Sequence, residues 1–489
     1  MSVRVRFAPS PTGYLHIGGL RTALYCYLFA RSQDGSLVLR IEDTDRTRFV
    51  EDAEEDILQA LQWCGLKVDE GLEHGGDYAP YRQSERQTLY VKYAQSLVES
   101  GHAYYAFDTP DAIAELRRDN EAYGIATRYK MDNSLTQAAD IVRQRLASQE
   151  AHVIRLRIPE KETIQFHDFI KGTVQVETES IDDQVLIKSD GMPTYHLANV
   201  VDDHHMAISH VIRGDEWIPS TPKHILLYQA LGWQPPQMAH LPLILSPTGG
   251  KLSKRSADRQ GIPINLRDYR ARGYEPQAVV NFLAFLGWNP GTEEEVFTLE
   301  ELEQEFSLER VGSAPAKFDL DKLQWFNGQH LRRLDTESLI ARVKPFLEEK
   351  LIEVKDENYL REVCLLVQDR LEYASDVVTR FGYCFLDPDS YDPKGIKKRW
   401  KPDSADLVEE YSKQIESMQF FNEASLEEEL RNISENRGIG AGRIIHPVRL
   451  AVSGTIAGPS LFKLLQILGR ETCVRRLRRA ANILGSQNK

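Results

Sequence analysis

The alternation of short apolar strands and helical patterns in the first half of this 489-residue chain is the feature that most constrains its fold. Apolar runs typical of strands lie at residues 3–8, 37–41, 207–213 and 241–245, and helical patterns lie at residues 16–32 and 220–231. Strand–helix–strand alternation predicts a parallel sheet with helices on both faces. Ligands bind such sheets at the carboxyl ends of the strands, so we expect the functional residues there.

Two other stretches of the chain show different patterns. Residues 87–194 combine charged helical patterns with a strand-like run at residues 153–158, which indicates an α+β insertion into the α/β domain. From residue 335 onward the apolar residues recur at helical spacing, for example at Leu360 and Val363. We therefore expect the C-terminal third to be all helix.

Bulk properties exclude several classes of protein. Apolar residues make up 42% of the chain and charged residues 27%, which is ordinary for a soluble globular protein. No run of 18 apolar residues and no secretory pattern at residues 1–12 is present, so we expect no membrane association. The scattered cysteines, which suggest neither disulfides nor a metal site, indicate a reduced, cytoplasmic protein: Cys26, Cys64, Cys364, Cys384 and Cys473.

Positive charge is concentrated at the C-terminal end. Residues 438–489 contain nine Lys or Arg residues and one acidic residue, Glu471, within a chain whose formal net charge is −13. A local basic end on an acidic body suits one specific polyanionic partner, because the acidic bulk repels other phosphate chains. A solvated, basic terminal helix is an equal alternative on charge alone.

The segment SPTGYLHIGG (residues 10–19) follows the first predicted strand and opens the first predicted helix. Gly18 and Gly19 leave room for a ligand to approach the backbone, and the amides of a helix N-terminus suit phosphate. His16 at that position can donate a hydrogen bond to phosphoryl oxygens as they gain charge. Taken alone, the segment is also compatible with an ordinary capped helix and a surface histidine.

A second basic motif, KLSKR (residues 251–255), follows a predicted strand and a glycine-containing turn. Three cations in five residues indicate a clamp for a triphosphate, which is most effective if it tightens in the transition state. A solvated basic turn is the alternative for this motif alone.

Together the two motifs resemble, in order and separation, the ATP signatures HIGH and KMSKS of class I aminoacyl-tRNA synthetases. Gly19 replaces the last residue of the first signature, and Leu252 and Arg255 replace residues of the second, as is familiar in the glutamyl branch. Four further strings resemble the glutamyl and glutaminyl enzymes: RFAPSPTG (6–13), RIEDTD (40–45), PTYHLANVVDD (193–203) and VIRGDEW (211–217). The helical C-terminal third resembles the bacterial glutamyl type, whereas glutaminyl enzymes end in β-barrels.

This resemblance implies a fold in five parts. These are an α/β Rossmann-like parallel-sheet catalytic domain (1–86 and 195–245), an α+β acceptor-binding insertion (87–194), a stem-contact domain (246–334), and an all-α anticodon-binding region of two domains (335–382 and 383–489). We expect the chain to act as a monomer.

The resemblance also assigns candidate site residues. Residues implied to bind glutamate are Arg6, Ala8, Ser10, Glu42, Tyr195, Asn199 and Arg213, with Glu42 meeting the α-ammonium group and Arg213 with Arg6 meeting the γ-carboxylate. Residues implied to bind ATP are His16, Gly18, Gly19, Glu216, Ile244, Lys251, Ser253, Lys254 and Arg255, of which His16 and Lys254 act in catalysis. Arginine suits the γ-carboxylate because it can form two parallel hydrogen bonds with it.

The same family pattern suggests four tRNA contacts and a metal requirement. Arg475, Arg478 and Arg479 fall on one face of a helix predicted at residues 470–484, and Arg370 matches an anticodon-reading arginine of relatives. Mg²⁺ is expected to accompany the ATP, with no protein cage for it. Some bacterial relatives bind zinc in the insertion, but this chain has no cysteine between Cys64 and Cys364, so no structural zinc is expected.

The implied reaction is ATP-dependent ligation of L-glutamate to the 3′ end of tRNA(Glu) through glutamyl-adenylate, with tRNA required for the first step. The alternatives are a non-discriminating enzyme that also charges tRNA(Gln), an enzyme that glutamylates a modified tRNA base, an inactive tRNA-binding paralogue and a nucleotidylyltransferase. The last three are disfavoured by the helical third or by the intact His16, Glu42, Arg213 and Lys254.

Overall fold

The computed structural model describes residues 2–109, 111–115, 118, 132–252, 257 and 259–486. The chain forms two compact units. Unit 1 comprises Met1–Arg270 with Val279–Leu320, and unit 2 comprises Ala271–Ala278 with Asp321–Lys489. The five domain boundaries predicted from the sequence are finer than this division and stay predictions.

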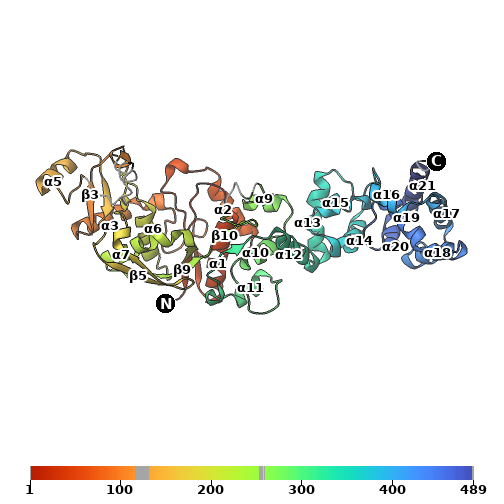
Figure 1. Cartoon of the computed structure of the whole chain (residues 1–489), viewed down its shortest axis with the longest axis horizontal. Coiled ribbons are helices and arrows are strands. Elements are labelled where there is room, and N and C mark those ends of the chain that lie inside the picture. The colour runs from red at the N-terminus through yellow and green to blue at the C-terminus, as the bar shows by residue number, and fades with distance from the viewer. Residues whose placement is uncertain are drawn as a thin grey trace. The chain divides into compact units, whose positions relative to one another are not determined.

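Unit 1 is built on two parallel strand pairs, each connected by a helix. Strand β1 (Arg4–Phe7) pairs with β2 (Ser36–Leu39), and α1 (Ile17–Ser32) joins them. Strand β8 (His210–Gly214) pairs with β9 (Gln237–Leu241), and α7 (Thr221–Ala230) joins these. Figure 1 labels both connecting helices, α1 and α7, and one of the strands, β9. The amide of Ser209 donates to the carbonyl of Arg4 over 2.9 Å and links the two pairs. The predicted α/β arrangement with parallel strands is therefore confirmed.

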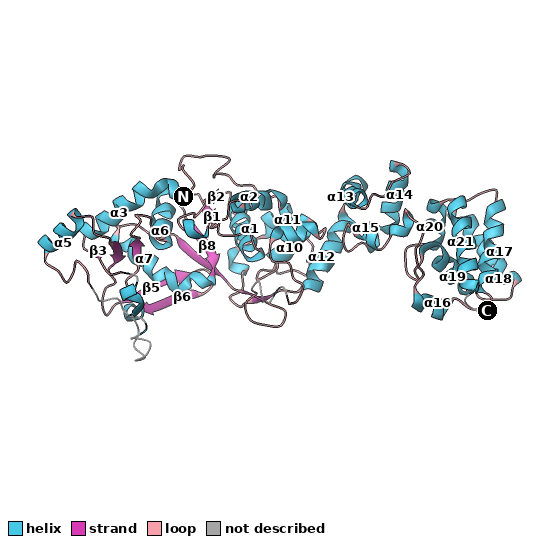
Figure 2. Cartoon of the chain, turned by 90° about the horizontal axis from the view of Figure 1, so that it is seen from above, coloured by secondary structure: helices cyan, strands magenta, loops and turns pink. Residues whose placement is uncertain are grey.

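The sheet also includes strands from the range predicted as an insertion. Strand β5 (Thr163–Asp168) runs parallel to β9, and β6 (Gly172–Glu177) runs antiparallel to β5, which gives the order β6-β5-β9-β8. Figure 2 labels β5, β6 and β8 of this sheet. A separate antiparallel sheet in the same range consists of β3 (Ala103–Ala106), β4 (Val153–Leu156) and β7 (Val185–Ile187). Asp168, the last residue of β5, is thereby placed beside β9, which becomes important below.

The other regular elements of unit 1 follow the sequence patterns. Its remaining helices of at least six residues are α2 (Ala53–Trp63), α3 (Gln87–Glu99), α5 (Ala139–Ala147), α6 (Tyr195–His205) and α11 (Leu299–Glu305). Helices α9 (Leu266–Ala271) and α10 (Pro276–Ala284) lie around the boundary between the units.

Two strand predictions differ from the structure. Residues 241–245 form parts of two strands, because β9 ends at Leu241 and β10 (Ile244–Leu245) pairs instead with β11 (Ala316–Lys317). Pro242 explains the break, since it has no N–H to donate to a ladder. The strand predicted from residue 207 begins at His210, because Ala207 adopts φ +53° and ends the preceding helix.

Unit 2 is helical throughout its described residues, as predicted. Its longer helices are α12 (Leu320–Arg333), α13 (Thr336–Glu349), α14 (Glu357–Val367), α17 (Ser404–Ser417), α18 (Glu423–Asn436), α19 (Gly442–Ser453), α20 (Leu461–Leu468) and α21 (Arg470–Ser486), and the shorter ones are α15 (Asp376–Thr379) and α16 (Pro393–Arg399). The apolar face of α14, including Leu360 and Val363, lies in the core as its spacing predicts. The side chain of Asp356 accepts from the Tyr359 amide and caps the start of this helix.

Candidate functional site

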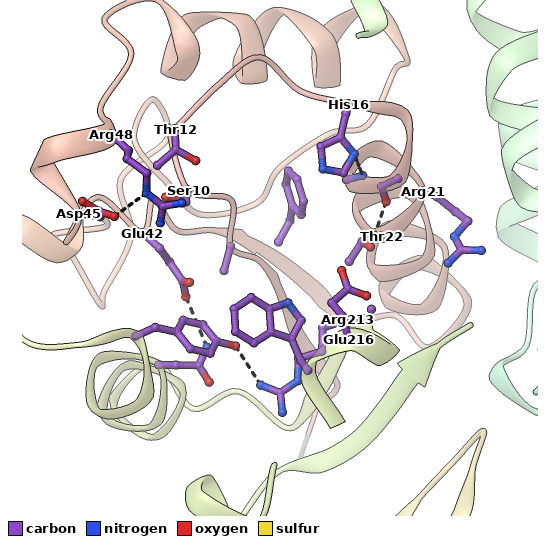
Figure 3. Close-up of a pocket in the computed structure, with 18 of the residues that line it drawn as sticks. Ser10, Thr12, His16, Arg21, Thr22, Glu42, Asp45, Arg48, Arg213 and Glu216 are labelled. Carbon is purple, nitrogen blue, oxygen red and sulfur yellow. Dashed lines mark hydrogen bonds and ion pairs between the residues drawn. The ribbon is translucent and has the colours of Figure 1, made fainter. Parts of the chain in front are cut away.

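A cavity of about 1120 Å³ opens in unit 1, where β1 and β8 end and α1 begins. All the predicted glutamate- and ATP-binding residues that the structure describes line it, and they come from separate segments: Arg6, Ala8, Ser10, His16, Gly18, Gly19, Glu42, Tyr195, Asn199, Arg213, Glu216, Ile244 and Lys251. Ser253, Lys254 and Arg255 lie outside the described residues. Figure 3 shows His16 at the start of its helix, with Glu42 and Arg213 reaching the cavity from other segments.

His16 caps the N-terminus of α1. Its Nδ1 accepts a hydrogen bond from the Gly19 amide over 3.0 Å. In the neutral ring the proton is therefore on Nε2, so this nitrogen is a donor. A Cβ added at Gly19 would lie 2.9 Å from a methyl carbon of Leu15, and one at Gly18 would lie 3.2 Å from the His16 ring. The two glycines thus let the backbone turn tightly around the histidine.

The start of α1 is held in place by a segment far along the chain. The Ile17 amide donates to the Ile264 carbonyl over 2.9 Å, and the Leu266 amide donates to the Leu15 carbonyl over 3.1 Å. The Asp56 carboxylate accepts from the Leu15 amide over 2.8 Å. The amides of Ile17 and Gly19 are thus used within the protein, and the amide of Gly18 between them lies on a braced backbone at the positive end of the helix, which suits an anion.

Arg213 lies at the end of β8 and is buried. Its Nε donates to His240 Nε2 over 3.0 Å, and its Nη2 donates to the Thr221 hydroxyl over 2.9 Å. Its Nη1 lies 3.0 Å from the Tyr195 hydroxyl, to which it donates, and 3.3 Å from His224 Nδ1. Among the described residues every hydrogen-bond partner of this guanidinium is neutral, and one of its five N–H groups has no acceptor there.

A second charged cluster holds Glu42. Arg40 donates to Glu42 over 3.0 Å and to Asp203 over 2.7 Å, and Asp203 also accepts from Arg6 over 3.0 Å. With its amide oriented to accept, Asn199 lies 3.3 Å from Arg6 and 3.2 Å from Arg40. The two arginines are therefore already paired with carboxylates, whereas Arg213 is not.

Burial raises the pKa of Glu42, and the neighbouring Arg40 and Arg6 offset part of that rise. A buried carboxylate of this kind gains from a further positive group placed against it. The cavity therefore offers an anion that lacks full compensation at Glu42 and a cation that lacks a carboxylate at Arg213. A zwitterion with an additional side-chain carboxylate matches both.

The other end of the cavity suits a nucleotide. Gly214 permits the Glu216 side chain to fold back, since a Cβ there would lie 2.2 Å from the Glu216 carboxylate. Leu252 donates from its amide to the Ile244 carbonyl over 2.9 Å, which returns the chain to β10 beside Lys251. The described part of the KLSKR motif thus begins at the cavity edge.

The sequence motifs match a known family over both halves of the chain. Residues 2–325 match the catalytic domain of the class I tRNA synthetases (E and Q), and residues 338–481 match an anticodon binding domain. The glutamate–tRNA ligase of Christiangramia forsetii is 46% identical over 501 residues, and the match covers 99% of each chain. The glutamate–tRNA ligase of Chloroherpeton thalassium is likewise 46% identical over 504 residues, with 99% of each chain covered.

Solved structures give the same result. A glutamate tRNA ligase from Elizabethkingia meningosepticum, determined in complex with its amino acid, has a TM-score of 0.94 and 40% identity and covers 99% of this chain and 100% of its own. The Elizabethkingia anophelis glutamate–tRNA synthetase has a TM-score of 0.92 at the same identity and coverage. The chain belongs to the glutamate–tRNA ligases. The expected class I catalytic domain and helical anticodon-binding region are confirmed.

The sequence interpretation missed several residues that support this ligase cavity. Asp203 and Arg40 lie within the quoted motifs without an assigned role, although charges in otherwise apolar runs are a usable signal. Trp217, also within a motif, packs on Tyr195 with ring centroids 4.3 Å apart. Asp168 and His240 lie outside every quoted motif.

In unit 2 of the ligase, the predicted tRNA-binding arginines of α21 are exposed but ion-paired. Arg475 pairs with Asp387, Arg479 lies 4.0 Å from the same carboxylate, and Arg478 pairs with Glu416. Arg476, the arginine next to Arg475 on α21, is instead buried: it donates to Asp387 over 2.8 Å and to three backbone carbonyls. Arg476 is therefore a structural residue of the helical core.

The fourth predicted tRNA contact, Arg370, is exposed at the end of a short 3₁₀ turn after α14. It lines a second cavity of about 580 Å³ within unit 2, together with Leu365 and Lys463. The carboxylates of Glu362 and Asp369 also line this cavity, so its two cations are accompanied by two acidic groups. Its role in tRNA binding stays a prediction.

Among the described residues of the ligase, no group of three or more His, Cys, Asp or Glu side chains is arranged to hold a metal ion. The expectation of no structural zinc stays a prediction, because residues 110, 116, 117 and 119–131 of the insertion lie outside that part. None of the described helices is both long enough and apolar enough to span a membrane. All five cysteines are buried and unpaired with one another.

Proposed function

We propose that this chain ligates L-glutamate to the 3′ end of tRNA(Glu) with ATP, through a glutamyl-adenylate intermediate that is consumed with release of AMP. The observation that carries the proposal is Arg213, a buried guanidinium with only neutral partners, in the same cavity as Glu42 and the N-terminus of α1. Family membership and this charge arrangement point to the same amino acid.

Glutamate recognition requires three charged contacts. Glu42 receives the α-ammonium group, while Arg213 and Arg6 receive the γ-carboxylate beside Tyr195 and Asn199. Ala8 and Ser10 form the pocket floor. Glutamine lacks the side-chain charge, so it would leave the guanidinium of Arg213 desolvated and unpaired, which is unfavourable by several kcal/mol, on the order of 2–5.

ATP, bound as its Mg²⁺ complex, occupies the end of the cavity near α1. The helix amide of Gly18 and the Nε2–H of His16 face the phosphates, while Gly19, whose amide donates to His16 Nδ1, leaves room for them beside the backbone. Glu216 with Ile244 contacts the adenosine. Lys251, Ser253, Lys254 and Arg255 bind the triphosphate. The metal ion is a part of the substrate, held by phosphate oxygens, and it spreads the charge that develops on them.

The chemistry needs no protein nucleophile. An oxygen of the glutamate α-carboxylate attacks the α-phosphorus of ATP in line, the bond to the bridging oxygen breaks, and pyrophosphate leaves. A ribose hydroxyl of the tRNA terminus then attacks the carbonyl carbon of the mixed anhydride, and AMP leaves as the ester forms. Orientation and charge stabilisation by His16 and Lys254 supply the catalysis.

The proposal is tested by charging assays with purified tRNA(Glu) and tRNA(Gln), each with glutamate and with glutamine. We expect glutamyl-tRNA(Glu) and pyrophosphate in equal amounts, and no product with glutamine. Pyrophosphate exchange should require tRNA, as it does typically in this family. Comparable charging of tRNA(Gln) with glutamate would replace the proposal by the non-discriminating alternative, and absence of glutamyl-tRNA would overturn it.

A further inference from the structure

Two buried side chains lie behind Arg213 on the side away from the cavity lining. His240 is on β9 and Asp168 is the last residue of β5, and both are fully buried. His240 Nε2 lies 3.0 Å from Arg213 Nε, and His240 Nδ1 lies 2.6 Å from Asp168 Oδ2. The three side chains form a line of hydrogen bonds from the pocket into the sheet.

The donors and acceptors in this line can be assigned. Arg213 Nε always carries a proton, so His240 Nε2 must accept it. Burial lowers the pKa of His240, and the charge of Arg213 adds to this effect while Asp168 opposes it. The ring is therefore neutral, and its single proton is on Nδ1, directed at Asp168.

Asp168 is fixed by the backbone around it. Its Oδ1 accepts from the amides of Ile170, Lys171 and His240 over 3.0, 2.9 and 3.3 Å. Burial alone would raise the pKa of Asp168, but the hydrogen bond from His240 and those from the amides outweigh it and lower the pKa. Asp168 is thus an ionised carboxylate with only one oxygen available to the imidazole.

We propose that Asp168 and His240 are positioning residues that set the glutamate affinity and specificity of the pocket. Asp168 selects the His240 tautomer, and His240 then orients the guanidinium of Arg213. The inference rests on the proposed function, because it assumes that Arg213 binds the side-chain carboxylate of the substrate.

The arrangement solves a conflict at the binding site. A carboxylate in direct contact with Arg213 would stabilise the buried cation but would occupy the donors that the substrate needs. With a neutral imidazole between them, Asp168 supplies the counter-charge at a distance and leaves the guanidinium open to the cavity. Tyr195 and Thr221, also neutral, complete the orientation.

The substitution Asp168→Asn, which exchanges one carboxylate oxygen for an NH₂ group, tests whether Asp168 selects the His240 tautomer. In Asp168→Asn, the three amides that face Oδ1 require the amide oxygen of the asparagine at that position, so its NH₂ faces His240. The ring then accepts at Nδ1 and carries its proton on Nε2, opposite the Nε–H of Arg213. We expect the glutamate KM to rise on the order of tenfold to a hundredfold, since a hydrogen bond to a charged group is replaced by two opposed donors.

The KM for ATP and the kcat should change far less in this variant. Loss of uniform ground-state binding raises KM without lowering kcat, whereas partial unfolding lowers the apparent kcat and leaves KM unchanged. The split between the two parameters thus separates positioning of Arg213 from general destabilisation.

Variants at His240 test whether a neutral acceptor near Arg213 Nε restores the glutamate KM. His240→Leu removes the acceptor and should raise the glutamate KM as Asp168→Asn does. His240→Gln places an amide oxygen near Arg213 Nε without a tautomer to select, so its glutamate KM should rise less. Adding Asp168→Asn to His240→Gln should then raise the glutamate KM no further, which is a non-additive double-mutant cycle.

The proposed positioning role is overturned if Asp168→Asn leaves the glutamate KM at the parental value. It is also overturned if Asp168→Asn raises that KM by the same factor in the parental enzyme and in the His240→Gln variant. Both outcomes require a parental enzyme that forms glutamyl-tRNA, so they leave the proposed function standing. A parental protein that forms none would overturn the proposed function itself.

Discussion

Arg213 shows at the scale of a single residue how burial creates specificity. Its guanidinium is 5% exposed and has hydrogen-bond partners on β9, α6 and α7 but no ion pair with a described carboxylate. A desolvated cation with neutral partners is costly to bury, and binding of an anion offsets that cost. We therefore expect the cavity to favour a ligand that brings a carboxylate to Arg213, because this cation is electrostatically unfavourable when it is unpaired.

Replacement of this residue should affect glutamate binding above all. Arg213→Ala is expected to raise the glutamate KM by about 100-fold or more, from the ~2–5 kcal/mol lost when one partner of a desolvated charge pair is removed. Arg213→Lys is the matched control. It keeps the charge but cannot satisfy the four neighbouring acceptors in the same geometry, so its glutamate KM should lie between those of the parental enzyme and Arg213→Ala. Steady-state pyrophosphate exchange measures both, and an unchanged KM in the alanine variant would refute the pocket assignment.

Glu42 predicts a pH dependence. Burial raises its pKa, with Arg40 and Arg6 offsetting part of the rise, and only the ionised carboxylate can pair with the α-ammonium group. Glutamate affinity is thus fully present above the pKa of Glu42 and is lost as the pH falls through it. Because that pKa is raised, the loss should begin above the range of the substrate's own γ-carboxylate, whose pKa is about 4.3.

The measurement is the glutamate KM from about pH 5 to pH 8, spanning the ordinary carboxyl and histidine range. Glu42→Gln removes the titrating group, so its KM should be higher than the parental value at neutral pH and nearly independent of pH. A parental KM that is constant over this range, or a variant that keeps the parental slope, would contradict the role given to Glu42.

At this scale the sequence predicted two charged side chains that line the cavity, Arg213 and Glu42, but did not predict the buried pair behind Arg213. Arg213 and Glu42 lie within motifs that carry the family resemblance. Asp168 and His240 are 72 residues apart and lie in no such motif, and only the pairing of β5 with β9 brings them together. One signal was present: Asp168 occupies a position of β5 that alternates with the buried Ile164 and Phe166, where a charge is unusual.

At the scale of elements, the proposed function gives the N-cap side chain of α1, His16, a catalytic role in addition to its structural one. His16 Nδ1 caps the helix at the Gly19 amide, so the phosphate-facing donor and the helix start are fixed together. Loss of an N-cap is destabilising by about 0.5–2 kcal/mol. A change at His16 therefore affects both stability and turnover unless the two are separated.

Two substitutions at His16 separate the effect on stability from the effect on turnover. His16→Ala removes the cap and the ring, and it should lower both Tm and kcat. His16→Asn retains a good N-cap side chain but lacks the ring donor, so it should lower kcat with a Tm close to the parental one. Thermal unfolding and single-turnover adenylate formation provide the two measurements. Parental kcat in the asparagine variant would show that His16 acts only as a cap.

The elements whose bounds were predicted from the sequence lie within a few residues of the observed ones, and the exceptions have local causes. The period of apolar residues located α1 and α7 and indicated that the C-terminal third is helical, because one buried face dictates that period, but it did not give the bounds of most helices in unit 2. Pro242 divides the strand predicted at residues 241–245 into two. The apolar run itself does not indicate that Leu241 pairs with β8 and residues 244–245 with β11. The order of the strands in the sheet could not be predicted either, because an apolar run does not indicate its partner strand.

At the scale of the whole molecule, the chemistry is confined to unit 1 and the predicted anticodon contacts to unit 2. The sequence predicted this division because the α/β alternation gives way to helical periodicity along the chain. It did not predict that the basic face of α21 is already compensated: Asp387 and Glu416 pair with its arginines. A tRNA phosphate bound there must compete with these carboxylates, which weakens each contact.

The last prediction tests whether the two units act separately. Replacing Arg475, Arg478 and Arg479 together by alanine should weaken tRNA binding and reduce its log–log salt slope by up to about 2–3 units, if each arginine neutralises one phosphate. The kcat at saturating tRNA should persist. Lys254→Ala should do the opposite: it should lower kcat more than it raises the ATP KM and leave tRNA affinity nearly unchanged, because the clamp acts on the developing phosphate charge. Arg431 and Arg437, exposed and ion-paired with Glu427 and Glu410, supply a charge control whose replacement should leave the salt slope near the parental value. If the triple variant also kept the parental slope, the α21 face would be a solvated helix surface whose arginines serve only their intramolecular ion pairs.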